Sequence, residues 1–324
     1  MNLIEITEKF PEEIDAIRYF ERKRYGKKNK CAYCNSEKLS KRTKDFRFKC
    51  YDCNKTSFVT VGTHLHSSNM DLKKWMFAFA IISNAKKGIS ARQLKRDLGI
   101  SHPTAWKMYH KIRELMTIEN KETILDDVIE IDSTQIGGKP RKCQIEKKGT
   151  PKHIPELDKA KEKYEDMGYD FKEGEYKKPC KTGKQKRGKG SEKKVVAGVV
   201  KRDGNVVAEV IQNTNFSELK KIIDKHIDTD NSVLLMDSDT AQKKLSKIID
   251  SIVIDHSKLY SYRGLNTNSI ESFWAIIKRQ IIGQHHHVTP KYLNKYVQET
   301  VFKYNNRNDD DMFETLAANA MQNN

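Results

Sequence analysis

The stretch "KKVVAGVVKRDGNVVAEVI", residues 193–211, decides the class of fold. It contains two valine-rich runs on either side of Asp203-Gly204, a pair that favours the tight turn of a β-hairpin. Apolar runs of similar length stand before and after it, "DDVIEID" at 126–132 and "SVLLMD" at 232–237. Because short apolar runs bounded by polar residues are typical of buried strands, we expect all of them to form one sheet.

Segments with helical periodicity follow these strands along the chain. We expect helices at about 216–228, 239–250, 269–282 and 290–306. Together with the strands, they give the order strand, hairpin, helix, strand, helix, strand, helix. This order predicts an α/β fold with a ribonuclease H-like mixed sheet and flanking helices.

Two of the expected strands carry a carboxylate at or near their carboxyl end. Asp132 follows "VIEI", and Asp237 follows "VLLM". A charged side chain that closes a buried strand is costly unless a cation lies nearby. Ligand-binding crevices of open sheets also lie at the carboxyl ends of strands, so both aspartates are candidates for an acidic site.

The helix expected at 269–282 carries a third acidic residue. In "NTNSIESFWAIIKRQ", residues 266–280, the large apolar side chains fall on one helical stripe, and we expect Trp274 among them to pack in the core. Glu271 and Lys278 are seven residues apart and border this stripe. Because seven residues make about two helical turns, both side chains could face one cleft.

Two interpretations of Glu271 stay open. A capping box with Asn268 as the cap explains the glutamate without any catalytic role. The combination of Glu271 with Asp132 and Asp237 instead favours a set of three acidic residues, two from strands and one from a helix.

Four of the six cysteines form two C-x-x-C pairs, "CAYC" at 31–34 and "CYDC" at 50–53, with 15 residues between them. This spacing is typical of a zinc ribbon, and four thiolates leave no open position on the metal for catalysis. Two structural disulfides are the poorer interpretation for a chain of the reducing cytoplasm. The predicted ligands of a structural zinc ion are Cys31, Cys34, Cys50 and Cys53.

Three further helices are expected before the first strand, at 71–84, 90–99 and 103–116. The last two are joined by the tight "GIS" turn, with Ser90 and Ser101 as helix caps, which is the pattern of a helix-turn-helix. A plain helical bundle explains the pattern equally well, but the adjacent ribbon and the positive charge favour DNA. The residues left available to a DNA groove are His102, Thr104, Lys107 and Lys111.

Composition limits the class of partner. The 324 residues contain 61 Lys and Arg against 44 Asp and Glu, a net charge of +17, which favours a polyanion, although solubility alone also explains such an excess. The longest apolar run, "WMFAFAII" at 75–82, is far below the roughly 18 residues that a membrane span needs. The acidic start of the chain does not resemble a signal peptide. We therefore expect a soluble, cytoplasmic protein.

Several stretches together resemble a known family. They are "CAYC" and "CYDC" followed by "GTHLHSS", then "GISARQL", "IEIDSTQIGGK", "GVVKRDGNV", "LLMDSDTAQKKL" and "NTNSIESFWAIIKRQIIGQHHHVTPKYLNKYVQETVFKYNNR". In these stretches the chain resembles the DDE transposases of bacterial insertion sequences, in the ISXO-type branch with an amino-terminal zinc ribbon. The resemblance covers nearly the whole chain apart from residues 140–190.

The resemblance implies an enzyme that cuts and joins DNA ends with Mg²⁺ or Mn²⁺. Asp132 and Asp237 match the first two acids of the motif, Glu271 the third, and Lys278 the basic residue that follows. Asn268 shares the third assignment with Glu271. The implied partner is double-stranded DNA, both the element ends and the target, bound by a dimer or higher oligomer near the bacterial nucleoid.

Residues beside this motif can assist it. Arg279, opposite the apolar stripe, is expected to contact DNA elsewhere.

A non-catalytic DNA-binding protein, such as a regulator or a domesticated transposase, is the alternative function. A ribonuclease is weaker, because a helix-turn-helix suits duplex DNA better than RNA.

These features divide the chain into three expected parts: an N-terminal helix and zinc ribbon at 1–66, a helix-turn-helix at 67–120 and the catalytic domain at 121–324. A basic insertion interrupts the last part at about 140–192. Residues 139–194 hold 19 Lys or Arg against 10 Asp or Glu, so the insertion is either a DNA-contacting segment or a solvated loop. Cys143 and Cys180 within it lack ligand spacing and are expected to be free thiols.

Overall fold

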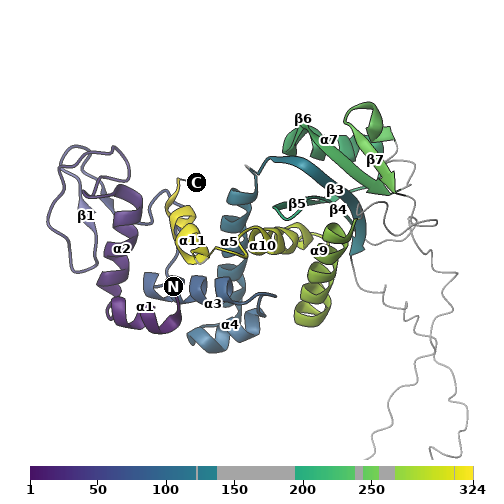
Figure 1. Ribbon diagram of the computed structural model, residues 1–324. Coiled ribbons are helices and arrows are strands. Elements are labelled where there is room, and N and C mark those ends of the chain that lie inside the picture. Colours follow the sequence, from purple (N-terminus) through teal and green to yellow (C-terminus); the bar gives the residue numbers. More distant parts are fainter. Residues whose placement is uncertain (122, 137–193, 238–243, 255–266, 310, 324) are drawn as a thin grey trace, which may run out of the picture. The chain divides into compact units, whose positions relative to one another are not determined.

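The computed structural model describes residues 1–121, 123–136, 194–237, 244–254, 267–309 and 311–323 (Figure 1). The described residues all belong to one compact unit, Met1–Gly137 with Lys194–Asn324. The predicted insertion at 140–192, including Cys143 and Cys180, lies outside them.

A five-stranded mixed sheet forms the second half of this unit. Its strands are β3 (Leu125–Ile136), β4 (Lys194–Lys201), β5 (Val206–Ile211), β6 (Ile227–Asp237) and β7 (Ser251–Ile254). They lie in the order β5-β4-β3-β6-β7, with β3, β4 and β5 antiparallel and with β6 and β7 parallel to β3. This is the ribonuclease H-like arrangement, and the predicted fold class is confirmed.

The hairpin of β4 and β5 is buried on both faces. Alternate side chains of β4 enter different cores, Ala197 and Val199 on one face and Val196 and Val200 on the other. This explains why the run is almost continuously apolar rather than alternating. The turn lies where it was predicted, with Asp203 at a positive φ of 55° and Gly204 donating its N–H to the Lys201 carbonyl at 3.0 Å.

Helices cover both faces of the sheet. On one face lies α7 (Phe216–His226), and on the other lie α9 (Asn268–Arg279) and α10 (Leu293–Asn305) (Figure 1). The apolar stripe predicted for α9 is buried against the second face and consists of Ile270, Phe273, Trp274, Ile277 and Ile281. A π-helical segment, η3 (Gln280–His285), continues α9 toward α10.

One predicted helix is wrong over its described residues. The part of 239–250 that the structure describes holds only a 3₁₀ turn, η2 (Lys244–Lys247), and β7 begins at Ser251. Leu245 and Ile249 both pack into the core under α7. The chain turns after Ile249, because the Asp250 carbonyl accepts from the Leu234 N–H at 2.8 Å, where β7 begins to pair with β6.

The N-terminal helices surround a separate core. They are α1 (Leu3–Lys9), α2 (Glu13–Tyr25), α3 (Leu72–Asn84), α4 (Ala91–Leu98) and α5 (His102–Asn120). The turn between α4 and α5 has the predicted caps: Ser90 Oγ accepts from the Gln93 N–H at 3.1 Å, and Ser101 Oγ accepts from the Thr104 N–H at 3.3 Å. Gly99 closes α4 at a φ of 62°, a conformation that glycine adopts without strain.

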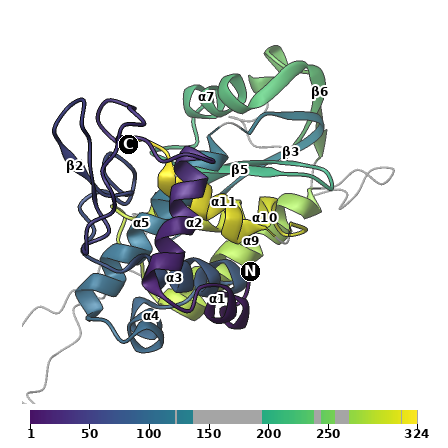
Figure 2. The same cartoon turned by 90° about the vertical axis from the view of Figure 1, so that its left-hand side faces the viewer.

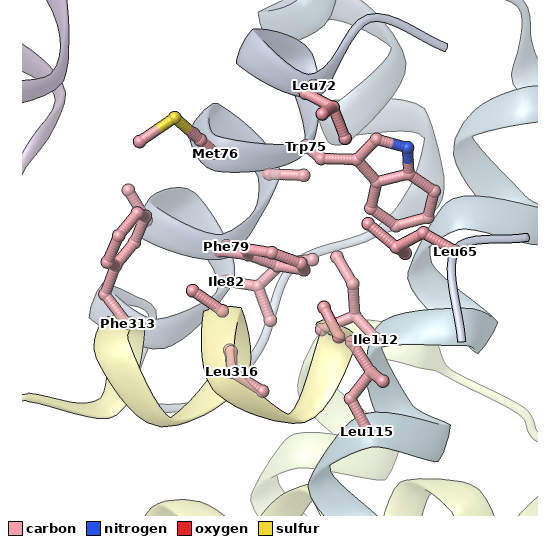
Figure 3. Packing of buried hydrophobic residues seen from close by; sticks show 14 of the residues in the cluster. Leu65, Leu72, Trp75, Met76, Phe79, Ile82, Ile112, Leu115, Phe313 and Leu316 are labelled. Carbon is pink, nitrogen blue, oxygen red and sulfur yellow. The ribbon is translucent and has the colours of Figure 1, made fainter. Parts of the chain in front are cut away.

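The last helix returns to this N-terminal core. Helix α11 (Met312–Met321), which the sequence did not predict, contacts α2, α3 and α5 (Figure 2). Its Phe313 and Leu316 pack with Phe79 of α3 (Figure 3). The chain therefore ends within the helical core of its first 120 residues, although the three-part division of the sequence remains a prediction.

In the described segments, none of the helices is long and apolar enough to span a membrane.

Candidate active site

Asp132 and Asp237 lie on neighbouring parallel strands. Ile131 of β3 pairs with Met236 of β6, so the two aspartates occupy the next position in register. Paired residues of parallel strands project to the same face, here the face covered by α9. Strand β3 continues to Ile136, so Asp132 lies within the strand rather than at its end.

Trp274 connects the helix α9 to Asp132. Its indole Nε1 donates to Asp132 Oδ2 at 3.0 Å, and only 3% of the residue is exposed. Gly198 pairs with Asp132 across β3 and β4, and a Cβ at Gly198 would lie 2.7 Å from Trp274 Cη2. The missing side chain at Gly198 thus makes room for the indole. We predicted Trp274 to pack in the core, which it does, but its polar contact was missed.

Glu271 lies one turn before Trp274 on α9 and is exposed. Residues three apart share a helix face, so its carboxylate lies on the side that contains Asp132. Burial raises the pKa of Asp132, and the negative charges of Asp237 and Glu271 raise it further. The structure therefore brings Asp237 and Glu271 near enough to Asp132 to repel its negative charge.

The carboxylate oxygens of Asp132, Asp237 and Glu271 do not all lie within 4.8 Å of one another. Across the described ranges, only the four cysteines have metal-ligand atoms that all lie within 4.8 Å of one another.

The capping interpretation of Glu271 is wrong. Helix α9 begins at Asn268 itself, and the N-cap residue, Thr267, makes no side-chain capping bond. The N–H of Ile270 instead donates to Glu130 Oε2 at 3.0 Å. A capping box with Asn268 is not formed, because a carboxylate of the sheet reaches the start of the helix and satisfies the orphan donor.

Glu130 is a second residue that sequence reasoning missed. It is fully buried, and Arg202 Nε lies 3.5 Å from its Oε1. It lies two residues before Asp132 on β3, and therefore on the same face of the sheet. This spacing was the feature of the sequence that could have pointed to Glu130. Its role is to attach the start of α9 to the sheet, because a carboxylate is favourable at a helix N-terminus.

The predicted basic residues of α9 face solvent. Lys278 is exposed and lies one turn after Trp274, so Glu271, Trp274 and Lys278 form one row along the helix. Arg279 is also exposed, and its Nε donates to the Ala275 carbonyl at 3.0 Å.

The four predicted zinc ligands converge. Their Sγ atoms all lie within 4.8 Å of one another, and the Cys31–Cys53 and Cys34–Cys50 pairs are each 3.6 Å apart. A tetrahedral ion with Zn–S bonds of about 2.3 Å requires S–S separations of about 3.8 Å, so the four thiolates fit zinc.

The chain around these cysteines has the form of a ribbon. Each pair is followed by an asparagine at positive φ, Asn35 at 58° and Asn54 at 59°. The short strands β1 (Phe48–Lys49) and β2 (Thr56–Ser57) pair antiparallel beside the second knuckle.

The residues predicted to contact DNA lie on the first turns of α5. His102 and Lys107 are exposed, whereas Thr104 and Lys111 are half-buried. Thr104, Lys107 and Lys111 line a cavity together with the segment 64–70.

Part of the chain matches a known protein family. Residues 170–305 match the ISXO2-like transposase domain. This range contains Asp237, Glu271 and Lys278, and it ends at the last residue of α10. Over these residues the chain is similar to the domain of an insertion-sequence DDE transposase, and the resemblance predicted from the sequence is confirmed there.

Two solved structures match weakly. A pre-cleavage Mos1 transpososome has 9% identity and a TM-score of 0.25, covering 75% of this chain and 78% of that chain. A Mos1 transposase paired-end complex with the left transposon end has 9% identity and a TM-score of 0.19, covering 77% and 80%. Scores this low do not establish a shared fold. No curated protein matches the sequence.

Proposed function

We propose that this protein is a DNA transposase that binds the terminal inverted repeats of its insertion sequence and catalyses metal-dependent strand cleavage and strand transfer. The observation that carries the proposal is the placement of Asp132 and Asp237 side by side on β3 and β6, beside the helix that bears Glu271. The transposase domain matched at 170–305 supports it independently.

The acidic residues are suited to Mg²⁺ or Mn²⁺. Asp132, Asp237 and Glu271, with Asn268 as the alternative third ligand, offer only oxygen atoms, which these cations prefer. Bound divalent ions would activate the attacking hydroxyl and stabilise the leaving oxygen of the phosphodiester. Burial raises the pKa of Asp132, and repulsion by Asp237 and Glu271 adds to it; this fits the donor set, because bound cations would relieve the repulsion.

Other side chains would position the reacting groups. Trp274 donates to one oxygen of Asp132 and would fix the orientation of its carboxylate. Lys278, in the same row of α9 as Glu271, would contact a phosphate beside the scissile bond, and Arg279 would contact the DNA backbone farther along. Because water and a DNA 3′-hydroxyl could attack in the same place, one site would serve both cleavage and strand transfer.

The N-terminal part would recognise the element ends. Zinc bound by the four cysteines would stabilise the ribbon, and the first turns of α5 would enter a DNA groove as the second helix of a helix-turn-helix. The boundaries 1–66, 67–120 and 121–324 are retained as functional parts. Joining two DNA ends would require at least a dimer on chromosomal DNA in the bacterial cytoplasm.

The test uses DNA from either side of the gene that contains its inverted repeats. The purified full chain should cleave and transfer these ends with Mg²⁺ or Mn²⁺, and Asp237→Asn should abolish both reactions while DNA binding remains. Wild-type binding without metal-dependent cleavage would establish the non-catalytic alternative. Full strand transfer by Asp237→Asn would overturn the assignment of the site.

A further inference from the structure

A cavity of about 400 Å³ opens between α5 and the segment 64–70. Its volume lies within the range of about 300–1,000 Å³ that is usual for small-molecule sites. Neither the acidic site nor the zinc site accounts for it, because no candidate metal ligand of either site lines it.

The wall and the rim of this cavity differ in chemistry. Leu65, Trp75 and Met108 line it from the buried core. Lys107 and Lys111, one turn apart on α5, line it with cationic side chains. An apolar hollow with a cationic rim suits a ligand that has an apolar face and a negative charge.

His64 adds a neutral polar group to the lining. Burial lowers the pKa of His64, and the positive charge of Lys111 lowers it further. A neutral imidazole can donate at one ring nitrogen and accept at the other, which suits the edge of a nucleobase.

The segment 64–70 is held in place by its own hydrogen bonds. His66 Nδ1 accepts from the Gly62 N–H at 3.1 Å. Ser68 Oγ accepts from Trp75 Nε1 at 3.0 Å and from the Met70 N–H at 3.3 Å. Because these contacts are made within the protein, the cavity is formed before any ligand arrives, and little ordering is needed on binding.

We propose that this cavity receives one unpaired nucleotide of the bound DNA, with its base against Trp75 and Met108 and its phosphate at Lys107 and Lys111. The inference rests on the proposed function, since DNA is the partner. DNA in which all bases are paired would contact only the cationic rim, through its phosphates. A base that has left the stack also has an apolar face to bury, and the cavity provides the matching surface.

The test measures the affinity of the full chain for two 30-base-pair duplexes of the terminal inverted repeat that differ by a single-nucleotide bulge, by fluorescence anisotropy at fixed salt. Wild-type protein should bind the bulged duplex about tenfold more tightly, as expected for one base in an apolar site. Asn69→Trp fills the cavity from an exposed lining position and should remove this preference, while affinity for the paired duplex changes less than about twofold.

Lys107→Ala is the second variant, because an exposed position tolerates the change without loss of fold. It should weaken binding to the bulged duplex more than to the paired one. The matched controls are Asn308→Trp in an exposed turn and Lys220→Ala on α7, neither of which lines the cavity, and both should keep the preference.

The outcomes separate the two proposals. Equal wild-type affinity for both duplexes, or an unchanged preference in Asn69→Trp and Lys107→Ala, overturns the cavity assignment and leaves DNA binding intact. Failure of the wild-type chain to bind either duplex overturns both this inference and the proposed function.

Discussion

The indole Nε1 of Trp274 donates a hydrogen bond of 3.0 Å to Oδ2 of Asp132, a residue 142 positions earlier in the chain. This contact joins the central strand of the sheet to the helix that carries Glu271 and Lys278. Glu130, two residues before Asp132, accepts from the first turn of the same helix. The orientation of α9 over β3 is therefore set by two polar contacts as well as by its apolar stripe.

Trp274→Phe should remove the donor and keep most of the packing. Asp132 then loses the group that orients it, so the rate of strand cleavage at saturating DNA should fall by roughly tenfold or more with little change in DNA affinity. A single-turnover cleavage assay with an anisotropy titration measures both quantities.

The control for this change is Trp106→Phe on α5, whose ring contacts His110 and Tyr292 rather than the acidic site. It should cleave at the parental rate. Parental cleavage by Trp274→Phe would show that the hydrogen bond has no positioning role.

Zinc should copurify with the protein at about one ion per chain, because the four cysteines offer one tetrahedral site. Cys50→Ser should lose the ion and unfold the ribbon, since metal binding supplies folding energy to so small a module. Elemental analysis and proteolysis of residues 27–66 measure these effects. Retention of zinc by Cys50→Ser would contradict the ligand assignment.

Glu299→Gln should destabilise the whole unit. This fully buried carboxylate accepts from Arg113 Nε at 2.8 Å, from Lys303 Nζ at 2.8 Å and from Tyr109 Oη at 2.6 Å. Without its charge, two buried cations lose their counterion, and the free energy of unfolding should fall by about 3–5 kcal/mol.

Chemical denaturation gives this free energy. Glu218→Gln, at a half-buried position, breaks the pair of Glu218 with the exposed Lys221 and should change it by less than about 1 kcal/mol. Equal effects of the two substitutions would show that the buried ion pairs of Glu299 contribute no more than a surface pair.

Stability should decline as the pH falls from about 6.5 toward 4. Burial lowers the pKa of His110 and of His285 to about 4, with the charge of Arg113 adding to the effect. The unfolded chain takes up protons at these residues below its ordinary histidine pKa of about 6.5, whereas the folded chain does so only near 4. The contribution of these two histidines to stability is therefore complete above about pH 6.5 and is lost as the pH falls toward 4.

His110→Phe keeps an aromatic ring in contact with Trp106 and Tyr292 but removes one of these protons. Thermal unfolding at pH 7 and at pH 5 should show a smaller difference for the variant than for the parent. An unchanged difference would mean that His110 does not take up a proton on unfolding in this range.

Much of the local structure was predictable because its causes lie within a few residues. The turn at Asp203-Gly204, the caps at Ser90 and Ser101, and the apolar stripe of α9 each depend on side chains close in sequence. The spacing of the four cysteines likewise predicted their convergence. Helix α11 was missed because its stability comes from packing on α2, α3 and α5, whose residues lie about 200 or more positions away.

The sequence by itself determined the fold class, the strands that carry Asp132 and Asp237, and the candidate zinc ligands, because periodicity, turn residues and motif spacing are local properties. Only the tertiary structure decided that Trp274 and Glu130 connect α9 to β3, that Glu271 is no cap, and that a cavity lies beside α5. These features depend on strand register and helix docking, which are set by the packing of the whole core, so no short segment contains them.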